Sequence, residues 1–262
     1  SSAGSTAFIR QSVSTASSGN TNINLNDGNI IYLNSVYDVS TLTFSNAKTA
    51  DDVSIIRPLS VSTPAASFAT GAVDFDNNDY LKIGSSSDFT MGTGDFTIEF
   101  WVKKDSTAQG GFFQISDTDG GFKSSGYTST LAGAWSGSGW HVYCGGTEVD
   151  KTSTVVADTW YHFAMVKNSG TTKLYIDGLE TISVSDSQNY DGTYIGINGY
   201  YSTSFLGDQK ISNFRIVKGT AVYTSNFNPP NQALVNLTNT KLLCCSNTSS
   251  TTTAEVTPGT IT

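Results

Sequence analysis

The sequence predicts an all-β protein on the strength of its periodicity and its turns. Short runs that alternate apolar and polar residues recur about every 8–12 residues, the spacing typical of an antiparallel sandwich or barrel. Clusters of Gly, Asn, Asp and Ser separate these runs, and no stretch shows a helical period of about 3.6 residues. We therefore expect an antiparallel sandwich or barrel.

The composition argues against nucleic acids and membranes as partners. The chain has 262 residues, a net charge of −8 and only 14 % charged residues, well below the roughly 25 % of an average domain. Without a cationic surface, we expect no nucleic-acid partner and no attraction to anionic membranes. No run reaches the ~18 apolar residues of a membrane span, so membrane insertion is not expected either. The first residues, SSAGSTAFIRQ, have no apolar signal region, which argues against secretory export.

The three cysteines are too few for a disulfide framework. Cys244 and Cys245 are neighbours, a spacing that strains a bridge between them, and Cys144 lies far away in the sequence. We expect reduced, buried thiols, as in a protein that folds in a reducing cytosol.

A composition break at residues 57–67, RPLSVSTPAAS, predicts a domain boundary. Before it, residues 1–62 contain short alternating runs that bury little area and leave sheet edges open. Such a module is expected to pair with copies of itself or with the next domain; alternatively, its strands complete the larger sandwich.

The strand signals after the break are stronger. In residues 94–104, GDFTIEFWVKK, every second residue is apolar, which predicts that Phe96, Ile98, Phe100 and Val102 face the core. Residues 160–166 carry bulky side chains on both faces, as expected of a central strand in a sheet covered on both sides. Asp177 and Gly178 between two apolar runs predict a tight hairpin.

Four blocks of the second region resemble laminin-G-like domains of the concanavalin A-like lectin/glucanase superfamily, and they occur in the order seen there. They are AVDFDNNDYLKI at 72–83, FTMGTGDFTIEFWVK at 89–103, DTWYHFAMVKNSGTTKLYIDG at 158–178 and FLGDQKISNFRIVKGTAVYTSNFNPP at 205–230. The resemblance implies a two-sheet antiparallel jelly-roll sandwich, which we place at residues 63–246. Residues 247–262, rich in Thr and Ser, are expected to form a weakly ordered C-terminal tail.

The closing block, with the following TKLLCC, resembles versions of this domain on structural proteins of tailed bacteriophages, above all marine ones, and the N-terminal module resembles repeats of phage tail fibres. This resemblance implies a protein on the exposed surface of the virion, assembled in the host cytoplasm. Its partners would be further copies of itself, with a trimer favoured by analogy, other virion proteins and a cell-surface glycan.

Catalysis is not expected. Laminarinase-like members of the superfamily carry the motif E-x-D-x-x-E, whose paired carboxylates flank the glycosidic bond, and this sequence lacks it. Glu99 is the lone glutamate of its strand, and His141 and His162 lie inside apolar strands, where a satisfied core histidine is more common than a general base.

Calcium is the cofactor that the resemblance allows, because related lectin domains hold one ion at the rim. Asp117 and Asp119 in ISDTDGG are the preferred ligands; Asp74 and Asp76 in DFDNNDY are the alternative, although such loops are usually turns.

Glycan binding uses aromatic faces beside amide and hydroxyl groups. The candidates lie in Gly- and Ser-rich or loop contexts, where aromatic residues also pack under a sheet rim or against a subunit; they are Trp135, Trp140, Asn198, Tyr200 and Tyr201. The sequence as a whole favours a non-enzymatic virion protein, a fibre, appendage or capsid decoration, that attaches to host-surface or environmental glycans. A free lectin module and a polysaccharide-degrading enzyme are the alternatives.

Overall fold

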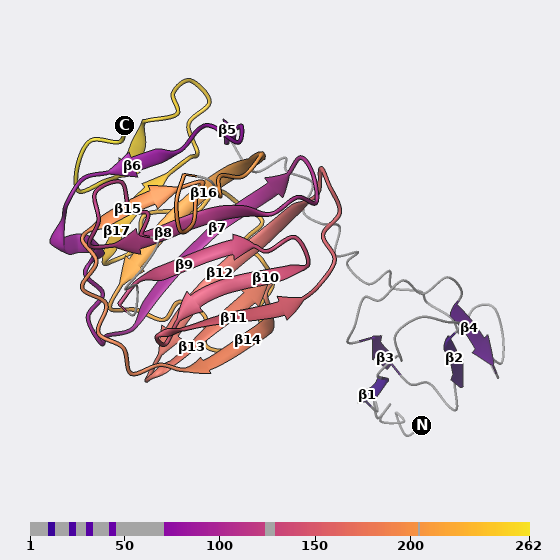
Figure 1. Ribbon diagram of the computed structural model, residues 1–262. Helices are drawn as coiled ribbons and strands as arrows, with labels where there is room; N and C mark the ends of the chain where they lie inside the picture. The colour runs from indigo at the N-terminus through magenta and orange to yellow at the C-terminus, as the bar shows by residue number, and fades with distance from the viewer. Residues whose placement is uncertain are drawn as a thin grey trace, which may run out of the picture. The chain divides into compact units, whose positions relative to one another are not determined.

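The computed structural model describes residues 71–123, 129–203 and 205–262, together with the backbone of the strands at 10–13, 21–24, 30–33 and 42–45. The chain forms two compact units, Ser1–Ser62 and Thr63–Thr262. Figure 1 labels their elements. The predicted break at residues 57–67 lies outside the described residues.

The strands of the N-terminal unit form parallel pairs. β1 (Arg10–Val13) pairs with β3 (Ile30–Leu33), and β2 (Thr21–Asn24) pairs with β4 (Leu42–Ser45). Arg10 aligns with Ile30 and Thr21 with Leu42, so the paired residues are 30 − 10 = 20 and 42 − 21 = 21 positions apart. Both pairs thus join strands about one repeat length apart that run in the same direction, which is how the strands of successive coils in a repeat stack.

The second unit contains two antiparallel sheets. The six-stranded sheet has the order β11-β10-β9-β8-β15-β6, and the larger sheet has the order β14-β13-β12-β7-β16-β17-β18, with β5 also paired to β16. The strands of the six-stranded sheet are β6 (Leu81–Ile83), β8 (Gly110–Ser116), β9 (Leu131–Trp135), β10 (Gly139–Cys144), β11 (Thr147–Thr152) and β15 (Tyr194–Ile197). Those of the larger sheet are β5 (Val73–Phe75), β7 (Phe96–Lys104), β12 (Trp160–Asn168), β13 (Thr171–Ile176), β14 (Leu179–Ser185), β16 (Gln209–Lys218), β17 (Thr240–Cys244) and β18 (Ala254–Val256).

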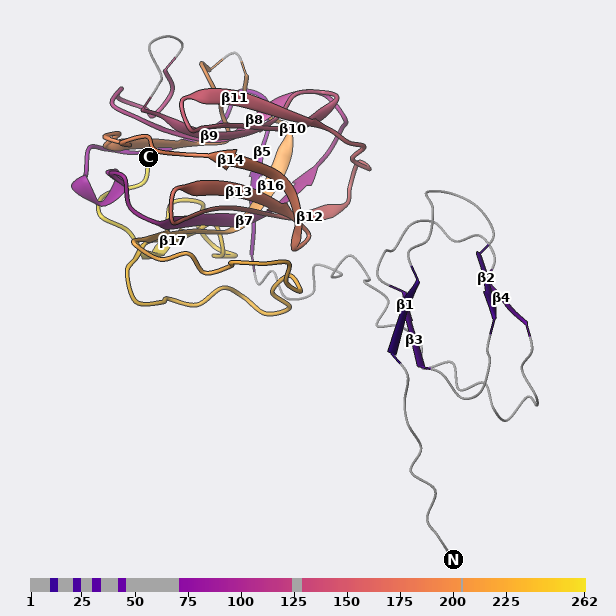
Figure 2. The same cartoon turned by 90° about the horizontal axis from the view of Figure 1, so that it is seen from below.

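The two sheets lie face to face as the layers of a sandwich, which Figure 2 shows from the side. Helical structure in the described residues is confined to a 3₁₀ turn, η2 (Ser87–Phe89). None of the described residues form a helix with the length and apolar character needed to cross a bilayer. The predicted all-β fold, a two-sheet antiparallel sandwich of the jelly-roll type, is confirmed.

The core between the sheets is aromatic. The four residues of β7 that the alternation placed inside are all fully buried. Phe100 is stacked between Phe163 of β12 and Phe214 of β16, with ring centroids 4.8 and 5.2 Å apart, and meets Phe113 of the opposite sheet edge-on at 6.0 Å. These contacts join both layers through one ring, because edge-on and stacked geometries both suit the ring quadrupole.

The outer face of the larger sheet is also covered. Ala164 and Val166 of β12 pack with Tyr175 in a second apolar cluster, against Tyr223 and Phe227 of the long segment between β16 and β17. We call residues 219–239 the covering segment. The prediction that β12 is buried on both faces is confirmed, and the cover explains why Glu99, on the outward face of β7, has no exposed surface.

The hairpin between β13 and β14 turns at Asp177 and Gly178, as predicted. Both residues have positive φ, 49° and 76°, which the mirror-image turns of hairpins require. A Cβ on Gly178 would lie 1.9 Å from the carbonyl oxygen of Phe227, so glycine is also needed for the close approach of the covering segment.

The prediction of a weakly ordered tail at residues 247–262 is wrong. β18 pairs with β17, and Ile261 forms a bridge with Ile83 and is only 4 % exposed. The backbone N–H and C=O of Thr262 bond to Lys82 of β6 at 3.0 and 2.8 Å. The end of the chain therefore closes one edge of both sheets, because backbone pairing and one buried isoleucine outweigh the polar composition.

Candidate functional site

A polar pocket of about 320 Å³ opens at one rim of the sandwich. Its walls come from the β5–β6 turn, the end of β7 with the loop that follows, and the loop between β15 and β16. The lining residues are Asn77, Lys104, Ser106, Ala108, Gln109, Thr203, Leu206 and Asp208. Amide, hydroxyl, carboxylate and ammonium groups thus surround one small volume, which is the set of groups that hydrogen-bond a sugar.

Lys104 is the cation of this rim pocket. It is the last residue of β7 and continues the inward alternation of that strand, so its side chain is only 2 % exposed. Its Nζ donates to Oε1 of Gln209 at 3.3 Å. Burial lowers the pKa of Lys104 to about 8, because desolvation disfavours the ammonium, while the carboxylates of Asp208 and Asp105 partly oppose this effect.

Asn198 connects two walls of the rim pocket by hydrogen bonds. Its Nδ2 donates to the carbonyl oxygens of Asp79 at 2.8 Å and of Gly207 at 2.9 Å, and its Oδ1 accepts from Nε2 of Gln209 at 2.6 Å. The residue is fully buried and has a φ of 71°, a left-handed conformation that asparagine tolerates. The sequence prediction that Asn198 contacts a glycan is therefore wrong; the residue ties the β5–β6 turn to the β15–β16 loop.

Tyr200 and Tyr201 belong to the same β15–β16 loop and are half-buried. The hydroxyl of Tyr200 donates to Oε1 of Glu148 at 2.7 Å, and its ring centroid is 4.9 Å from that of His141 on β10. The backbone N–H of Tyr201 donates to Oε1 of Gln114 at 3.0 Å. The loop thus extends from the rim pocket across the outer side of the six-stranded sheet, and the prediction of glycan contact by these tyrosines stays a prediction.

The prediction that Trp135 and Trp140 contact a glycan is wrong. Each is 2 % exposed, and both belong to the core between the sheets. Their rings meet edge-on with centroids 5.4 Å apart, and Nε1 of Trp135 donates to the carbonyl oxygen of Thr107 at 3.0 Å. The Gly- and Ser-rich context that suggested a loop is the turn of the β9–β10 hairpin, whose inward positions hold the tryptophans.

The predicted calcium ligands do not converge. Nζ of Lys123 bonds both carboxylate oxygens of Asp117, at 2.7 and 2.9 Å, whereas Asp119 is exposed. The hydrogen bond from Lys123 is the main reason that the pKa of Asp117 is lowered. The described part of the chain contains no group of three or more His, Cys, Asp and Glu side chains that could hold a metal ion. The ammonium of Lys123 therefore occupies both carboxylate oxygens of Asp117, one of the two preferred calcium ligands.

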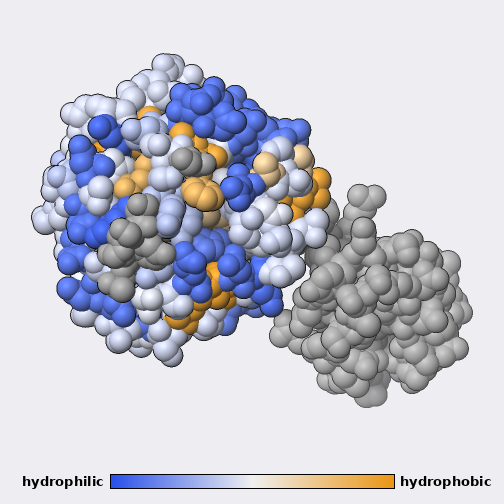
Figure 3. Space-filling model, viewed as in Figure 1, coloured by the Kyte–Doolittle hydropathy of each residue, from blue (hydrophilic) through white to orange (hydrophobic). Residues whose placement is uncertain are grey.

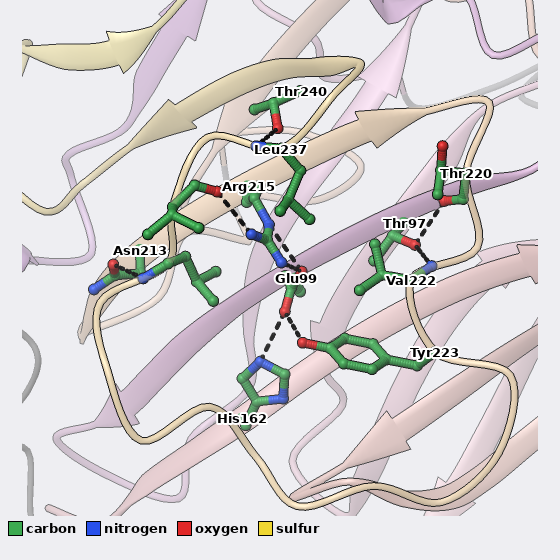
Figure 4. Close-up of polar contacts among 12 residues, drawn as sticks. Thr97, Glu99, His162, Asn213, Arg215, Thr220, Val222, Tyr223, Leu237 and Thr240 are labelled. Carbon is green, nitrogen blue, oxygen red and sulfur yellow. Dashed lines mark hydrogen bonds and ion pairs between the residues drawn. The ribbon is translucent and has the colours of Figure 1, made fainter.

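The conspicuous cluster of ionisable residues lies beneath the covering segment and not in a pocket. Oε1 of Glu99 accepts from Nε and Nη2 of Arg215 at 3.0 and 2.5 Å, and Oε2 meets Nε2 of His162 at 3.2 Å and the hydroxyl of Tyr223 at 2.7 Å (Figure 4). Glu99 and His162 have no exposed surface. A carboxylate that three buried or partly buried residues hold through four contacts, with no exposed surface, cannot reach a polysaccharide, so this cluster is structural.

The same cluster holds the covering segment onto the sheet. Nη1 of Arg215 donates to the carbonyl oxygen of Val235 at 2.8 Å, and Oγ1 of Thr97 accepts from the backbone of Val222 at 2.9 Å (Figure 4). Oδ1 of Asn213 accepts from the backbone of Leu234 at 2.9 Å. Buried side chains of β7 and β16 thus satisfy the backbone of a long segment that has no strand partner of its own.

The other surfaces are mixed in character. In the view of Figure 3, hydrophobic residues form small separate patches between hydrophilic ones. Among the described residues, the large hydrophobic side chains that are clearly exposed are Val156, Leu179 and Val235. Isolated apolar residues of this kind are normal on a protein surface. The rim pocket is therefore our candidate site, because it combines a concave surface with several kinds of polar side chain.

The sequence carries one local signal for the rim pocket. The apolar alternation of β7 predicts an inward position at residue 104, and a lysine there is unusual enough to mark a site. Asp208 and Gln209 lie at the start of β16, and pairing aligns Gln209 with Lys104. That register brings together residues more than a hundred positions apart, which no local pattern indicates.

The two-sheet sandwich gives the protein a lectin-like fold. A family model described as the concanavalin A-like lectin/glucanases superfamily, Laminin_G_3, matches residues 75–222. The match spans more than half of the chain, so the chain belongs to this family.

One solved structure supports the fold, and a second is a weaker match. A proposed carbohydrate-binding protein from Bacteroides ovatus superposes with a TM-score of 0.54 at 16 % identity, over 74 % of this chain and 57 % of that protein. Domains LG4-5 of the mouse laminin α1 chain give a TM-score of 0.41 at 16 % identity, over 60 % and 44 %. The chain thus spans less than two thirds of the length of either structure. None of the curated proteins compared with the chain matches it.

Proposed function

We propose that this chain is a non-enzymatic carbohydrate-binding protein whose rim pocket holds part of a glycan. The observation that carries the proposal is the pocket itself, in which donors and acceptors from separate loops converge. The pocket is rigidly built, because the buried pair Asn198 and Gln209 holds its walls. A pre-formed site of this kind loses little entropy when a sugar binds.

The number of carboxylates in the rim pocket supports a binding role over hydrolysis. Asp208 is the single carboxylate among the described lining residues, whereas glycoside hydrolysis uses two that flank the bond. Of the glutamates, Glu99 is buried, Glu148 accepts from Tyr200, and Glu180 pairs with Lys173 at 2.7 Å. These engagements favour a protein that holds a glycan without cutting it.

We further propose that the protein is exposed on a bacteriophage virion, as a fibre, appendage or capsid decoration, and attaches the particle to host-surface or environmental glycans. The closing block at 205–230 with the following TKLLCC and the N-terminal module support this setting by their resemblance to phage proteins, and so do the cysteines, which are free and buried. Thiols that stay reduced suit assembly in a host cytosol.

The N-terminal unit is the proposed anchoring or oligomerising part. Among its described strands each has one partner, so every pair keeps an open edge on either side. Open edges of parallel pairs accept further strands, and copies of the same unit supply strands of matching length. By analogy with fibres, we propose a trimer.

Two measurements test this function. The intact chain is applied to an array of neutral and acidic glycans, and its mass in solution is determined by light scattering. Binding to a defined glycan by an oligomer that mass spectrometry also detects in purified phage particles is the expected result. A monomer that binds glycans but is absent from particles supports a free lectin. Release of sugar fragments from a bound polysaccharide overturns the non-enzymatic role.

A further inference from the structure

The ammonium of Lys104 is buried with most of its hydrogen-bonding capacity unused. An ammonium has three donors, and among the described residues its one acceptor is Oε1 of Gln209, at 3.3 Å. No described carboxylate comes within ion-pair distance of it. A side chain that is 2 % exposed needs acceptors for its remaining donors, and the volume in front of it is the rim pocket.

The same pocket presents an acceptor of opposite charge. Asp208 is exposed and lines the rim pocket, and its carboxylate acts on Lys104 through space. A hydroxyl group both donates and accepts, so two adjacent hydroxyls satisfy the cation and the anion together. A carboxylate or sulfate on a sugar can only accept hydrogen bonds. It would accept one from Lys104, but the negative charge of Asp208 and the net charge of −8 on the chain would repel it.

We infer that the rim pocket recognises a neutral sugar through neighbouring hydroxyl groups, one accepting from Lys104 and the other donating to Asp208. The inference rests on the proposed carbohydrate-binding function and specifies its ligand class. Glycans rich in uronic acid or sulfate are the class that this charge pair discriminates against.

The depressed pKa of Lys104 adds a pH dependence. With a pKa of about 8 in the free protein, the ammonium is present at pH 6.5 and largely lost at pH 9.5. A bound hydroxyl oxygen stabilises the ammonium, so the ligand raises the pKa of Lys104 and binds more weakly as pH rises past 8. The other charged groups nearby are Asp105, Asp208 and Lys210. Lys210 forms ion pairs with Asp74 and Asp105.

The test uses the whole chain and calorimetric titration with hexasaccharides of glucose, galactose and arabinose, and with hexagalacturonate as the acidic probe. The wild type is expected to bind at least one neutral probe, and to bind it at least tenfold more tightly than hexagalacturonate. Lys104→Met is expected to lose about 10- to 100-fold in affinity, the range for a charged hydrogen bond. Asp208→Asn is expected to lose about tenfold, and it alters an exposed side chain, where substitutions usually change stability little.

Matched controls remove one positive and one negative charge from residues that do not line the pocket. Lys173→Gln and Asp158→Asn alter exposed ion pairs and should leave affinity within about twofold. Raising the pH from 6.5 to 9.5 should weaken wild-type binding about tenfold and leave Lys104→Met unchanged. Thermal unfolding monitors whether each variant is folded.

The outcomes separate this inference from the proposed function. Tighter binding of hexagalacturonate, or unchanged neutral binding in folded Lys104→Met and in Asp208→Asn, overturns the inference while carbohydrate binding stands. Absence of binding to every probe on the array and in the calorimeter overturns both.

Discussion

Arg215 of β16 and Glu99 of β7 are register partners on the outer face of the larger sheet, and Nε and Nη2 of the arginine both donate to the same oxygen, Oε1, of the glutamate. Both side chains are almost fully buried, 4 % and 0 % exposed. His162 and Tyr223 occupy the other oxygen, so the charge of Glu99 is fully satisfied beneath the covering segment.

We predict that Glu99→Gln strongly destabilises the sandwich. The variant leaves the guanidinium of Arg215 buried without a counter-charge, and breaking a buried pair on one side typically costs about 3–5 kcal/mol of unfolding free energy. Urea unfolding followed by fluorescence measures the loss. Lys173→Gln, which breaks the exposed pair with Glu180, serves as the control and should leave the midpoint unchanged. Equal midpoints for both variants would contradict the structural role.

The contribution of Glu99 should disappear in acid. Burial alone would raise its pKa, but the hydrogen bond and charge of His162, followed by those of Arg215, outweigh burial and lower the pKa below its ordinary value of 4.5. A lowered native pKa means that stability is fully present above about pH 4.5 and is lost as pH falls through the native value. The stability difference between wild type and Glu99→Gln should therefore shrink from pH 7 to pH 3, as urea titrations at each pH would reveal. A constant difference would refute this assignment.

Asn198→Ala is expected to weaken both stability and glycan binding. It removes the side-chain donor to the carbonyl groups of Asp79 and Gly207 and one of the two acceptors of the Gln209 amide, and it places alanine at a φ of 71°, for a total cost of about 3 kcal/mol. Asn198→Gly relieves the backbone strain but not the lost bonds, so it should recover about 1 kcal/mol and no affinity. Full recovery by glycine would show that the amide contacts are unimportant.

Ile261→Ala tests the correction at the C-terminus. Removing a side chain that is 4 % exposed should lower the unfolding free energy by about 2–4 kcal/mol. Val235→Ala, at a residue that is 60 % exposed, should change it by less than about 0.5 kcal/mol. Chemical denaturation of both variants provides the comparison, and an unaffected Ile261→Ala protein would restore the weakly ordered tail that composition suggested.

Local patterns in the sequence predicted the framework well. Alternation placed Phe96 and Phe100 in the core, and the pair Asp177 and Gly178 located a hairpin, because period-two burial and turn chemistry are encoded within a few residues. Composition failed at the tail, where one buried isoleucine and backbone pairing to β6 decide the outcome.

The site was less accessible to prediction. Trp135 and Trp140 looked like loop residues because the turn of the β9–β10 hairpin between them consists of Gly and Ser. The rim pocket depends on the pairing of Gln209 with Lys104 and on the reach of Asn198 to two distant turns. Such long-range register follows from the packing of the whole sandwich and not from any segment of it.

The covering segment makes the sandwich unequal on its two flanks. It passes beneath the larger sheet, on the side away from the six-stranded sheet (Figure 2), and its backbone is bonded by Arg215, Asn213 and Thr97. A docking molecule would meet an irregular loop on that flank instead of a ladder of strands. The proposed glycan binding would therefore take place at the rim, where the pocket opens, which would give the domain a fixed direction toward a glycan-bearing surface.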